Sequence, residues 1–289
     1  MEPLIVDQSE GIKPQLPSFT QSGLDDFLKI IKERGHEKLV DAAILHGLSL
    51  SSLNSHKADN KEVRQLPFEG FEKLQQGGIY YGQCVDGMRD GYGLLYCTNR
   101  SGIPLMYLCQ WEKGKPTKGC GLGILKDKWN KYEGHFDERY LRTGNGSWED
   151  EIGAWYQGEF KAGMRNGNGK YRNLEGGVYE GQWKADKMSG NGKFEWPNGN
   201  IYEGQWKNSN LDGIGKLKYP NGSIYEGGFK DSCEHGQGKL TSTNGQFLVG
   251  EWENRGPIGV HNCFTKNGTL LYYYTYNIDG TLVKIVEIL

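Results

Sequence analysis

Hydrophobic and polar residues alternate along much of the chain with a period of two, which predicts β-strands. In one segment, Tyr202, Gly204 and Trp206 would share one face of a strand. Glu203 and Gln205 would share the other face. The pattern therefore predicts a sheet with one aromatic, glycine-rich face and one mostly polar face.

This segment is one copy of a repeat whose regular period is 23 residues. Self-similarity at a fixed period of this length is typical of repeat architectures. Each copy begins at an anchor residue and continues into a second segment, which contains Gly-x-Gly in the first seven copies and Gly259 alone in the eighth. Eight anchors can be recognised: Tyr80, Tyr107, Tyr132, Tyr156, Tyr179, Tyr202, Tyr225 and Leu248.

The glycines and the turn residues predict how the strands pair. Glycine inside a strand costs about 0.5–1 kcal/mol relative to alanine, so its recurrence indicates that aromatic rings lie over bare backbone. Asn198-Gly199 and Asn221-Gly222 separate successive copies and supply positive φ for hairpin turns. Every strand is therefore expected to pair with the next in an antiparallel meander.

The pattern Tyr-x-Gly-x-Trp followed by Gly-x-Gly resembles the MORN repeat, over roughly Gly78 to Leu271. The resemblance implies an all-β fold, an elongated array of antiparallel β-hairpins that forms a single-layer twisted sheet. Cys84, Cys109 and Leu248 depart from the motif, at Trp, Gly and Tyr positions respectively.

The limits of the resemblance divide the chain into three segments: 1–77, 78–271 for the array, and 272–289. In the first segment, Leu24, Phe27 and Ile31 fall at helical spacing, and a second apolar group ends near Gly47. We expect a short helical hairpin there, followed by a polar linker at about 49–64. The helices could cover the first edge strand of the array or bind a partner.

The last segment is expected to cap the array or to serve in an interaction. Its β-branched residues favour a final hairpin over a helix. Both faces of such a strand would be largely apolar, so a partner protein, a second copy of this chain or the array's own last copies should cover it. The candidate interface comprises Leu282, Val283, Ile285, Val286, Ile288 and Leu289.

Composition and charge narrow the function. The chain has 289 residues, of which 44 are glycine and 36% are hydrophobic, so a thick core is not expected. The net charge of -2, with acids and bases interspersed, argues against nucleic-acid binding. The N-terminus lacks a basic segment followed by an apolar run, which predicts a cytoplasmic protein. Six irregularly spaced cysteines and the scattered histidines indicate no metal site, no cofactor and no catalytic group.

The resemblance implies a non-catalytic scaffold that binds a partner protein, as a helix or an extended segment, in a cytoskeletal, ciliary or membrane-associated assembly. The candidate structural or partner-binding aromatics are Tyr156, Phe160, Tyr179, Trp183, Tyr202, Trp206, Tyr225, Phe229 and Trp252. The alternative is a phospholipid-binding module that tethers the chain to a membrane. Its candidate lipid-facing residues are Lys193, Lys216, Lys218 and Lys239, on the same face as Glu180, Glu203 and Glu226.

Overall fold

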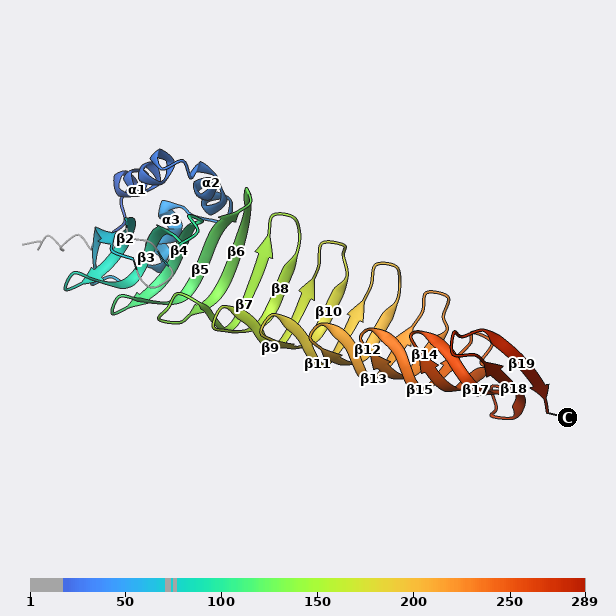
Figure 1. Ribbon diagram of the computed structural model, residues 1–289. Coiled ribbons are helices and arrows are strands. Elements are labelled where there is room, and N and C mark those ends of the chain that lie inside the picture. The colour runs from blue at the N-terminus through green and yellow to red at the C-terminus, as the bar shows by residue number, and fades with distance from the viewer. Residues whose placement is uncertain (1–17, 71–73, 75–76, 289) are drawn as a thin grey trace, which may run out of the picture. The chain divides into compact units, whose positions relative to one another are not determined.

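The predicted alternation forms antiparallel strands that follow one another along the chain (Figure 1). The computed structural model describes residues 18–70, 74 and 77–288. These residues form nineteen strands and three short helices, which confirms the mostly-β class with an N-terminal helical segment. The chain divides into two compact units, Met1–Ile124 and Leu125–Leu289.

Three helices open the first unit: α1 (Gln21–Glu33), α2 (Glu37–Leu45) and α3 (Leu50–His56). The side chain of Thr20 caps α1 by accepting a hydrogen bond from the Gly23 N–H, and Ser49 forms a capping box with Ser52 at the start of α3. The prediction of a polar linker at about 49–64 is therefore wrong. Its residues form α3 and the start of a strand, because the serines supply the helix cap.

Five strands complete the first unit: β1 (Glu62–Phe68), β2 (Gly78–Val85), β3 (Met88–Thr98), β4 (Pro104–Glu112) and β5 (Lys115–Leu125). Each pairs antiparallel with the next. The first edge of the array is covered by β1, which pairs with β2. The helices instead cover a face of the sheet, where Phe27 and Ile31 of α1 join a core with Tyr81 and Leu94 (Figure 1).

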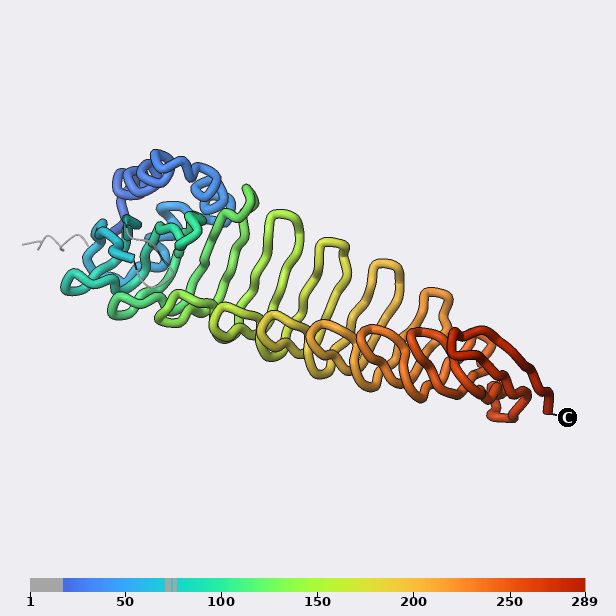
Figure 2. The backbone as a smooth tube through the Cα atoms, in the orientation of Figure 1, coloured from blue at the N-terminus to red at the C-terminus, as the bar shows by residue number. Residues whose placement is uncertain are grey.

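The second unit continues in hairpins (Figure 2). Its strands are β6 (Lys128–Phe136), β7 (Arg142–Asp150), β8 (Trp155–Lys161), β9 (Met164–Arg172), β10 (Val178–Lys184), β11 (Lys187–Glu195), β12 (Ile201–Lys207), β13 (Asn210–Lys218), β14 (Ile224–Lys230), β15 (Cys233–Thr241), β16 (Phe247–Glu253), β17 (Gly256–Phe264), β18 (Leu270–Tyr276) and β19 (Leu282–Glu287). The eight predicted copies correspond to the strand pairs from β2–β3 to β16–β17. The C-terminal segment adds the hairpin β18–β19, so the prediction of strand over helix there is confirmed.

Two kinds of turn alternate along the hairpins. Between copies, Gly199 and Gly222 have φ of 89° and 88°, as the Asn-Gly pairs predicted. Within every copy but the third, two residues connect the strands and both have positive φ, as at Asn208 and Ser209 with φ of 51° and 69°. In the third copy residues 137–141 connect β6 to β7, and the two-residue turn lies before it, at Lys126 and Asp127. Positive φ at both central positions matches a type I′ hairpin turn. The sequence did not reveal these turns because most of them contain no glycine.

Candidate binding surfaces

The aromatic face of each regular copy is built from one tyrosine and two glycines. Tyr202 is fully buried, and its hydroxyl donates a hydrogen bond to the carbonyl of Gln205 at 2.9 Å. A Cβ atom on Gly204 would lie 2.6 Å from Tyr202 Oη, and one on Gly215 would lie 2.5 Å from Tyr202 Cζ. The prediction that rings lie over bare backbone is thereby confirmed. Burial raises the pKa of Tyr202 to about 12.

The tryptophan of a copy connects it to the copy before. Trp206 makes edge-to-face contacts with Tyr202 of its own copy and Tyr179 of the preceding copy, both with ring centroids 5.3 Å apart. Its Nε1–H donates to the carbonyl of Gly192 at 3.0 Å. Trp183 contacts Tyr156 and Tyr179 in the same way. These rings therefore join neighbouring copies as well as strands.

All nine candidate aromatics of the array are buried. The buried set is Tyr156, Phe160, Tyr179, Trp183, Tyr202, Trp206, Tyr225, Phe229 and Trp252. Packing accounts for their recurrence, and a direct role in partner binding stays a prediction.

The eighth copy preserves the aromatic face by exchanging two residues. Leu248 stands at the tyrosine position, and His261 stands where the preceding copy has Gly238. A Cβ atom on Gly250 would lie 2.6 Å from His261 Nε2, so the imidazole fills the place of the missing tyrosine ring. His261 also makes edge-to-face contacts with Trp252 and Tyr276. The departure at Leu248 is thus compensated from the facing strand.

On the opposite face of the second unit, one line of directly paired residues crosses every strand from β8 to β19. We call this line the central row. In order it comprises Gln157, Lys170, Glu180, Lys193, Glu203, Lys216, Glu226, Lys239, Val249, Asn262, Tyr273 and Val286. Lysine and glutamate alternate through its first part, and uncharged residues replace them after Lys239.

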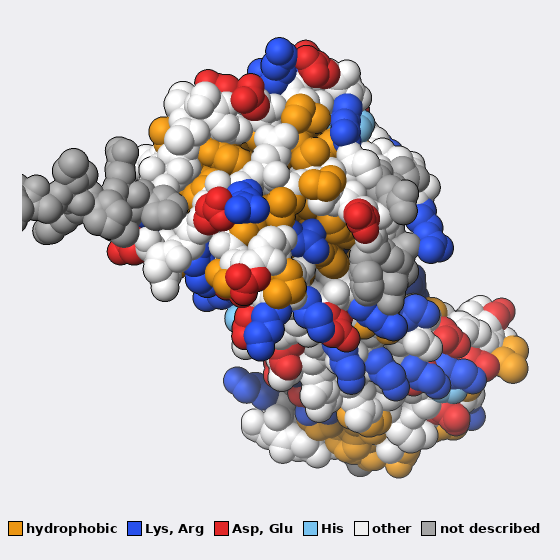
Figure 3. All heavy atoms as spheres, turned by 90° about the vertical axis from the view of Figure 1, so that its left-hand side faces the viewer, with side chains coloured by type: hydrophobic (Ala, Val, Ile, Leu, Met, Phe, Trp, Pro, Cys, Tyr) orange, Lys and Arg blue, Asp and Glu red, His pale blue; other side chains and the backbone are white. Residues whose placement is uncertain are grey.

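The four candidate lipid-facing lysines lie on this face of the sheet, among acids. Lys216 pairs with Glu226 across strands at 3.1 Å, and Lys193 pairs with Glu195 at 2.5 Å. The hydrogen bond to Glu195 raises the pKa of Lys193. Lys218 lies beside the row on the same face, and Lys239 belongs to the row. Basic side chains also lie among acidic ones on the face of the molecule drawn in Figure 3.

In the first unit, the line at the same repeat positions is apolar and covered by helices. It runs through Tyr81, Leu94, Leu108 and Cys120. The first three residues are buried in the core that α1, α2 and α3 form with the sheet. The sequence carried this signal, because Tyr81 and Leu94 break the alternation of polar and apolar positions.

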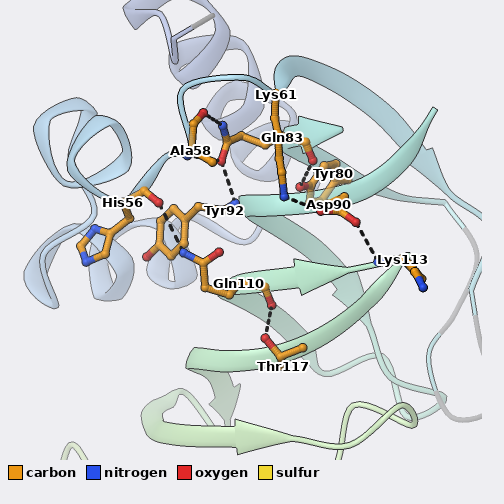
Figure 4. A network of polar contacts seen from close by, with 10 residues as sticks. All are labelled: His56, Ala58, Lys61, Tyr80, Gln83, Asp90, Tyr92, Gln110, Lys113 and Thr117. Carbon is orange, nitrogen blue, oxygen red and sulfur yellow. Dashed lines mark hydrogen bonds and ion pairs between the residues drawn. The ribbon is translucent and has the colours of Figure 1, made fainter. Parts of the chain in front are cut away.

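A polar network ties the segment between α3 and β1 to the sheet (Figure 4). Gln83 donates to the Ala58 carbonyl at 2.5 Å and accepts from the N–H groups of Ala58 and Tyr92 at 2.9 and 3.0 Å. Lys61 pairs with Asp90 at 2.5 Å, and that hydrogen bond lowers the pKa of Asp90. These contacts, together with the apolar core, fix the helical segment on its face of the sheet.

The C-terminal hairpin exposes apolar side chains. In β19, Leu282, Val283 and Ile285 are 44%, 59% and 55% exposed. Val286 and Ile288 are also exposed, while Leu289 lies outside the described residues. Among the described strands, β19 pairs with β18 alone. It therefore presents an open edge whose side chains are mostly apolar.

A hollow of about 590 Å³ on the second unit was not predicted from the sequence; it is lined by Trp129, Trp148 and Tyr171 among others. Arg165 lies over the rings of Trp183 and Tyr171, at 4.2 and 4.8 Å, and pairs with Asp186 at 3.1 Å. The only hint of this hollow in the sequence was Arg165, which follows the hairpin turn between β8 and β9. Regular copies carry other residue types at that position, so the repeat pattern did not single it out.

Comparison with known proteins agrees with this geometry. The family model of the MORN repeat matches residues 80–102, 156–173, 179–201, 202–224 and 225–247. The chain is therefore a MORN-repeat protein, in which five copies match the family model. The copies that fall outside it are the second, the third and the eighth.

Other comparisons add little. No curated protein matches the chain. A solved structure titled SAS-4 (dCPAP) TCP domain in complex with a proline-rich motif of Ana2 (dSTIL), from Drosophila melanogaster, is similar at 15% identity, over 67% of this chain and 88% of that chain. Its TM-score of 0.29 is too low to support any argument about fold or function.

Two further observations concern membranes and metals. The described helices are too short and too polar to span a membrane. Across residues 18–70, 74 and 77–288, no three His, Cys, Asp or Glu side chains gather where they could bind a metal ion. That the chain holds no metal or cofactor, and that it is not an enzyme, stay predictions.

Proposed function

We propose that this MORN array is a scaffold that binds partner proteins and positions them in a cytoskeletal, ciliary or membrane-associated assembly. The observation that carries the proposal is strand β19, which combines an open edge with exposed Leu282, Val283 and Ile285. An unpaired edge offers a row of N–H and C=O groups to another chain. Exposed, contiguous apolar surface typically marks an interaction site.

The packing of the aromatic face also supports partner binding at other surfaces of the array. Its rings contact one another and the glycine backbone, so they hold the copies together. Partner binding then falls to the surfaces that the repeats leave uncovered.

The charge pattern favours protein over phospholipid as the partner. Lys193 and Lys216 each have a glutamate directly opposite on both neighbouring strands. Attraction to an anionic membrane requires a cluster of lysines and arginines, and alternating charges cancel beyond about 10 Å at ordinary salt. The row therefore resembles a solvated face of paired charges more than a lipid site.

Deleting Thr281 to Leu289 tests the proposal. In affinity purification from the native cells, the full chain should recover one or more specific proteins that the deleted chain does not. The thermal melt of the array should stay unchanged. A double variant, Val283→Lys with Ile285→Lys, keeps the strand length and should lose the same proteins, whereas Ile214→Lys, at a 68% exposed position in another copy, should keep them.

Pelleting with vesicles that contain phosphatidylserine distinguishes the lipid alternative. Binding that depends on Lys193 and Lys216, with no specific protein recovered, would refute the scaffold. A different outcome is that the deletion melts the last copies while the chain is monomeric both with and without the segment. That result would show that the segment only stabilises the fold.

A further inference from the structure

The charged central row of the second unit ends abruptly before the C-terminus. From Lys170 to Lys239, lysine and glutamate alternate strand by strand. On the next four strands the row continues as Val249, Asn262, Tyr273 and Val286. A face that met only water throughout would have no reason to exchange paired charges for valine and tyrosine.

The residues around this part of the row enlarge an apolar area, which we call the C-terminal patch. It comprises Phe247, Val249, Val260, Phe264, Tyr273 and Val286, from strands β16 to β19. The rings of Phe247 and Phe264 stack with centroids 4.9 Å apart. Val260 is 59% exposed, Val286 is exposed, and the other four are partly exposed. In this structure the patch faces solvent.

The first unit shows what covers this face when its row is apolar. There, the positions equivalent to the row are Tyr81, Leu94 and Leu108, which are buried under helices. Helix α1 contributes Leu24, Phe27 and Ile31, which recur at the spacing of an amphipathic helix. This face of the repeats thus occurs in two forms. It is charged and open to water in the regular copies of the second unit, and it is apolar and covered by helices in the first unit.

We propose that the C-terminal patch binds an amphipathic α-helix of a partner protein, an inference that rests on the scaffold function and specifies its ligand. The helix would place an apolar stripe against Val249, Phe264 and Tyr273, in the mode of a helix that docks on a hydrophobic surface. Lys239, whose Nζ lies 4.5 Å from the Phe247 ring centre, and Lys284 border the patch on this face. Glu251 is the acid beside it. The two lysines favour a helix with acidic residues along its flank.

Photo-crosslinking identifies the contact directly. Benzoylphenylalanine replaces Val260 in the full chain, which is irradiated in extract of its native cells, and the cross-linked segment is sequenced by mass spectrometry. A synthetic peptide of that segment then serves as the probe. We expect apolar residues at helical spacing, micromolar binding by fluorescence anisotropy, and a gain of helical circular dichroism when the peptide binds.

Two substitutions restore the charged pattern of the regular copies: Val249→Glu and Tyr273→Glu. Each should weaken peptide binding at least tenfold and leave the thermal melt of the array within a few degrees. Ile214→Glu places the same change at an exposed position on this face in the sixth copy, and it should leave binding unchanged.

Other outcomes overturn the inference. A peptide that binds as an extended strand, or a segment that cross-links to a second copy of this chain, would replace the helix with strand pairing or self-association. The absence of any cross-link at position 260 would also overturn it. In these cases the scaffold proposal still stands if the β19 variants lose their recovered proteins, so the two failures are distinguishable.

Discussion

Replacing Trp206 with alanine should destabilise the array by about 3–5 kcal/mol. The side chain is only 5% exposed, and a buried tryptophan removes roughly 150–250 Å² from water. At about 25 cal/mol per Å², burial contributes roughly 4–6 kcal/mol, and a realistic unfolded chain reduces this by about 10–40%. Loss of the hydrogen bond to the Gly192 carbonyl adds about 1 kcal/mol.

The matched control is Trp206→Phe. Phe229 holds the same position in the next copy and contacts Tyr202 edge-to-face with centroids 4.9 Å apart. Phenylalanine should therefore keep the ring contacts and lose the hydrogen bond and some area, at a cost of about 1–2 kcal/mol. The free energy of unfolding should therefore be highest with tryptophan at position 206, lower with phenylalanine and lowest with alanine.

Urea denaturation followed by far-ultraviolet circular dichroism gives the free energy of unfolding. Native-state amide exchange should accompany it, because long repeat arrays can lose two-state behaviour. Protection should fall in strands β11 to β13, where the ring and its hydrogen-bond partner lie. A loss below about 1 kcal/mol for the alanine variant would refute the packing account, since a buried ring cannot be removed so cheaply.

Three further changes test other parts of the structure. Gly215→Val should unfold strands β12 and β13 locally, because its side chain would overlap the Tyr202 ring, and unchanged amide exchange there would contradict the ring-over-glycine geometry. Leu248→Tyr combined with His261→Gly should restore a regular copy. A double-mutant cycle by urea denaturation should therefore give a favourable coupling free energy of about 1 kcal/mol or more. If the effects of the two substitutions on the free energy of unfolding simply add, His261 does not stand in for the missing tyrosine ring. Burial raises the pKa of Tyr179 and Tyr202 to about 12. The folded array thus retains these protons above pH 10 while the unfolded chain loses them. The contribution of these two tyrosines to stability is fully present below about pH 10, and thermal melts should show a decline between pH 10 and 12.

Much of the array follows from two periods in the sequence. The alternation of two places Tyr202, Gly204 and Trp206 on one face, and the 23-residue repeat then places their equivalents on successive hairpins. Contacts of this kind are local and recur in each copy, so a single regular copy is enough to predict them. The strand conformation of the C-terminal segment followed from its β-branched residues.

The rest depended on contacts between parts of the chain that the repeat does not relate. Nothing in the period indicates that His261 replaces the ring absent at Leu248, because His261 comes to lie over Gly250 only when β16 pairs with β17. The covered face of the first unit was missed for a similar reason. Tyr81 and Leu94 show that a face is apolar, but which helix covers it is decided by tertiary packing.

The candidate binding surfaces were predicted unevenly. The exposed apolar side chains of β19 follow from a segment with two apolar faces, as at Val283 and Val286. The C-terminal patch does not, because Val249 and Tyr273 look unremarkable alone and become significant only as the continuation of a charged row.

The tryptophan contacts also give the array a direction of assembly. The ring that covers Tyr179 from the far side is Trp206, which belongs to the following copy. During synthesis, each of these tyrosines leaves the ribosome about one repeat before the tryptophan or phenylalanine that completes its surroundings. The sheet can therefore extend by one hairpin at a time on a template already formed, and the contacts made at each step are close in sequence, which favours rapid folding.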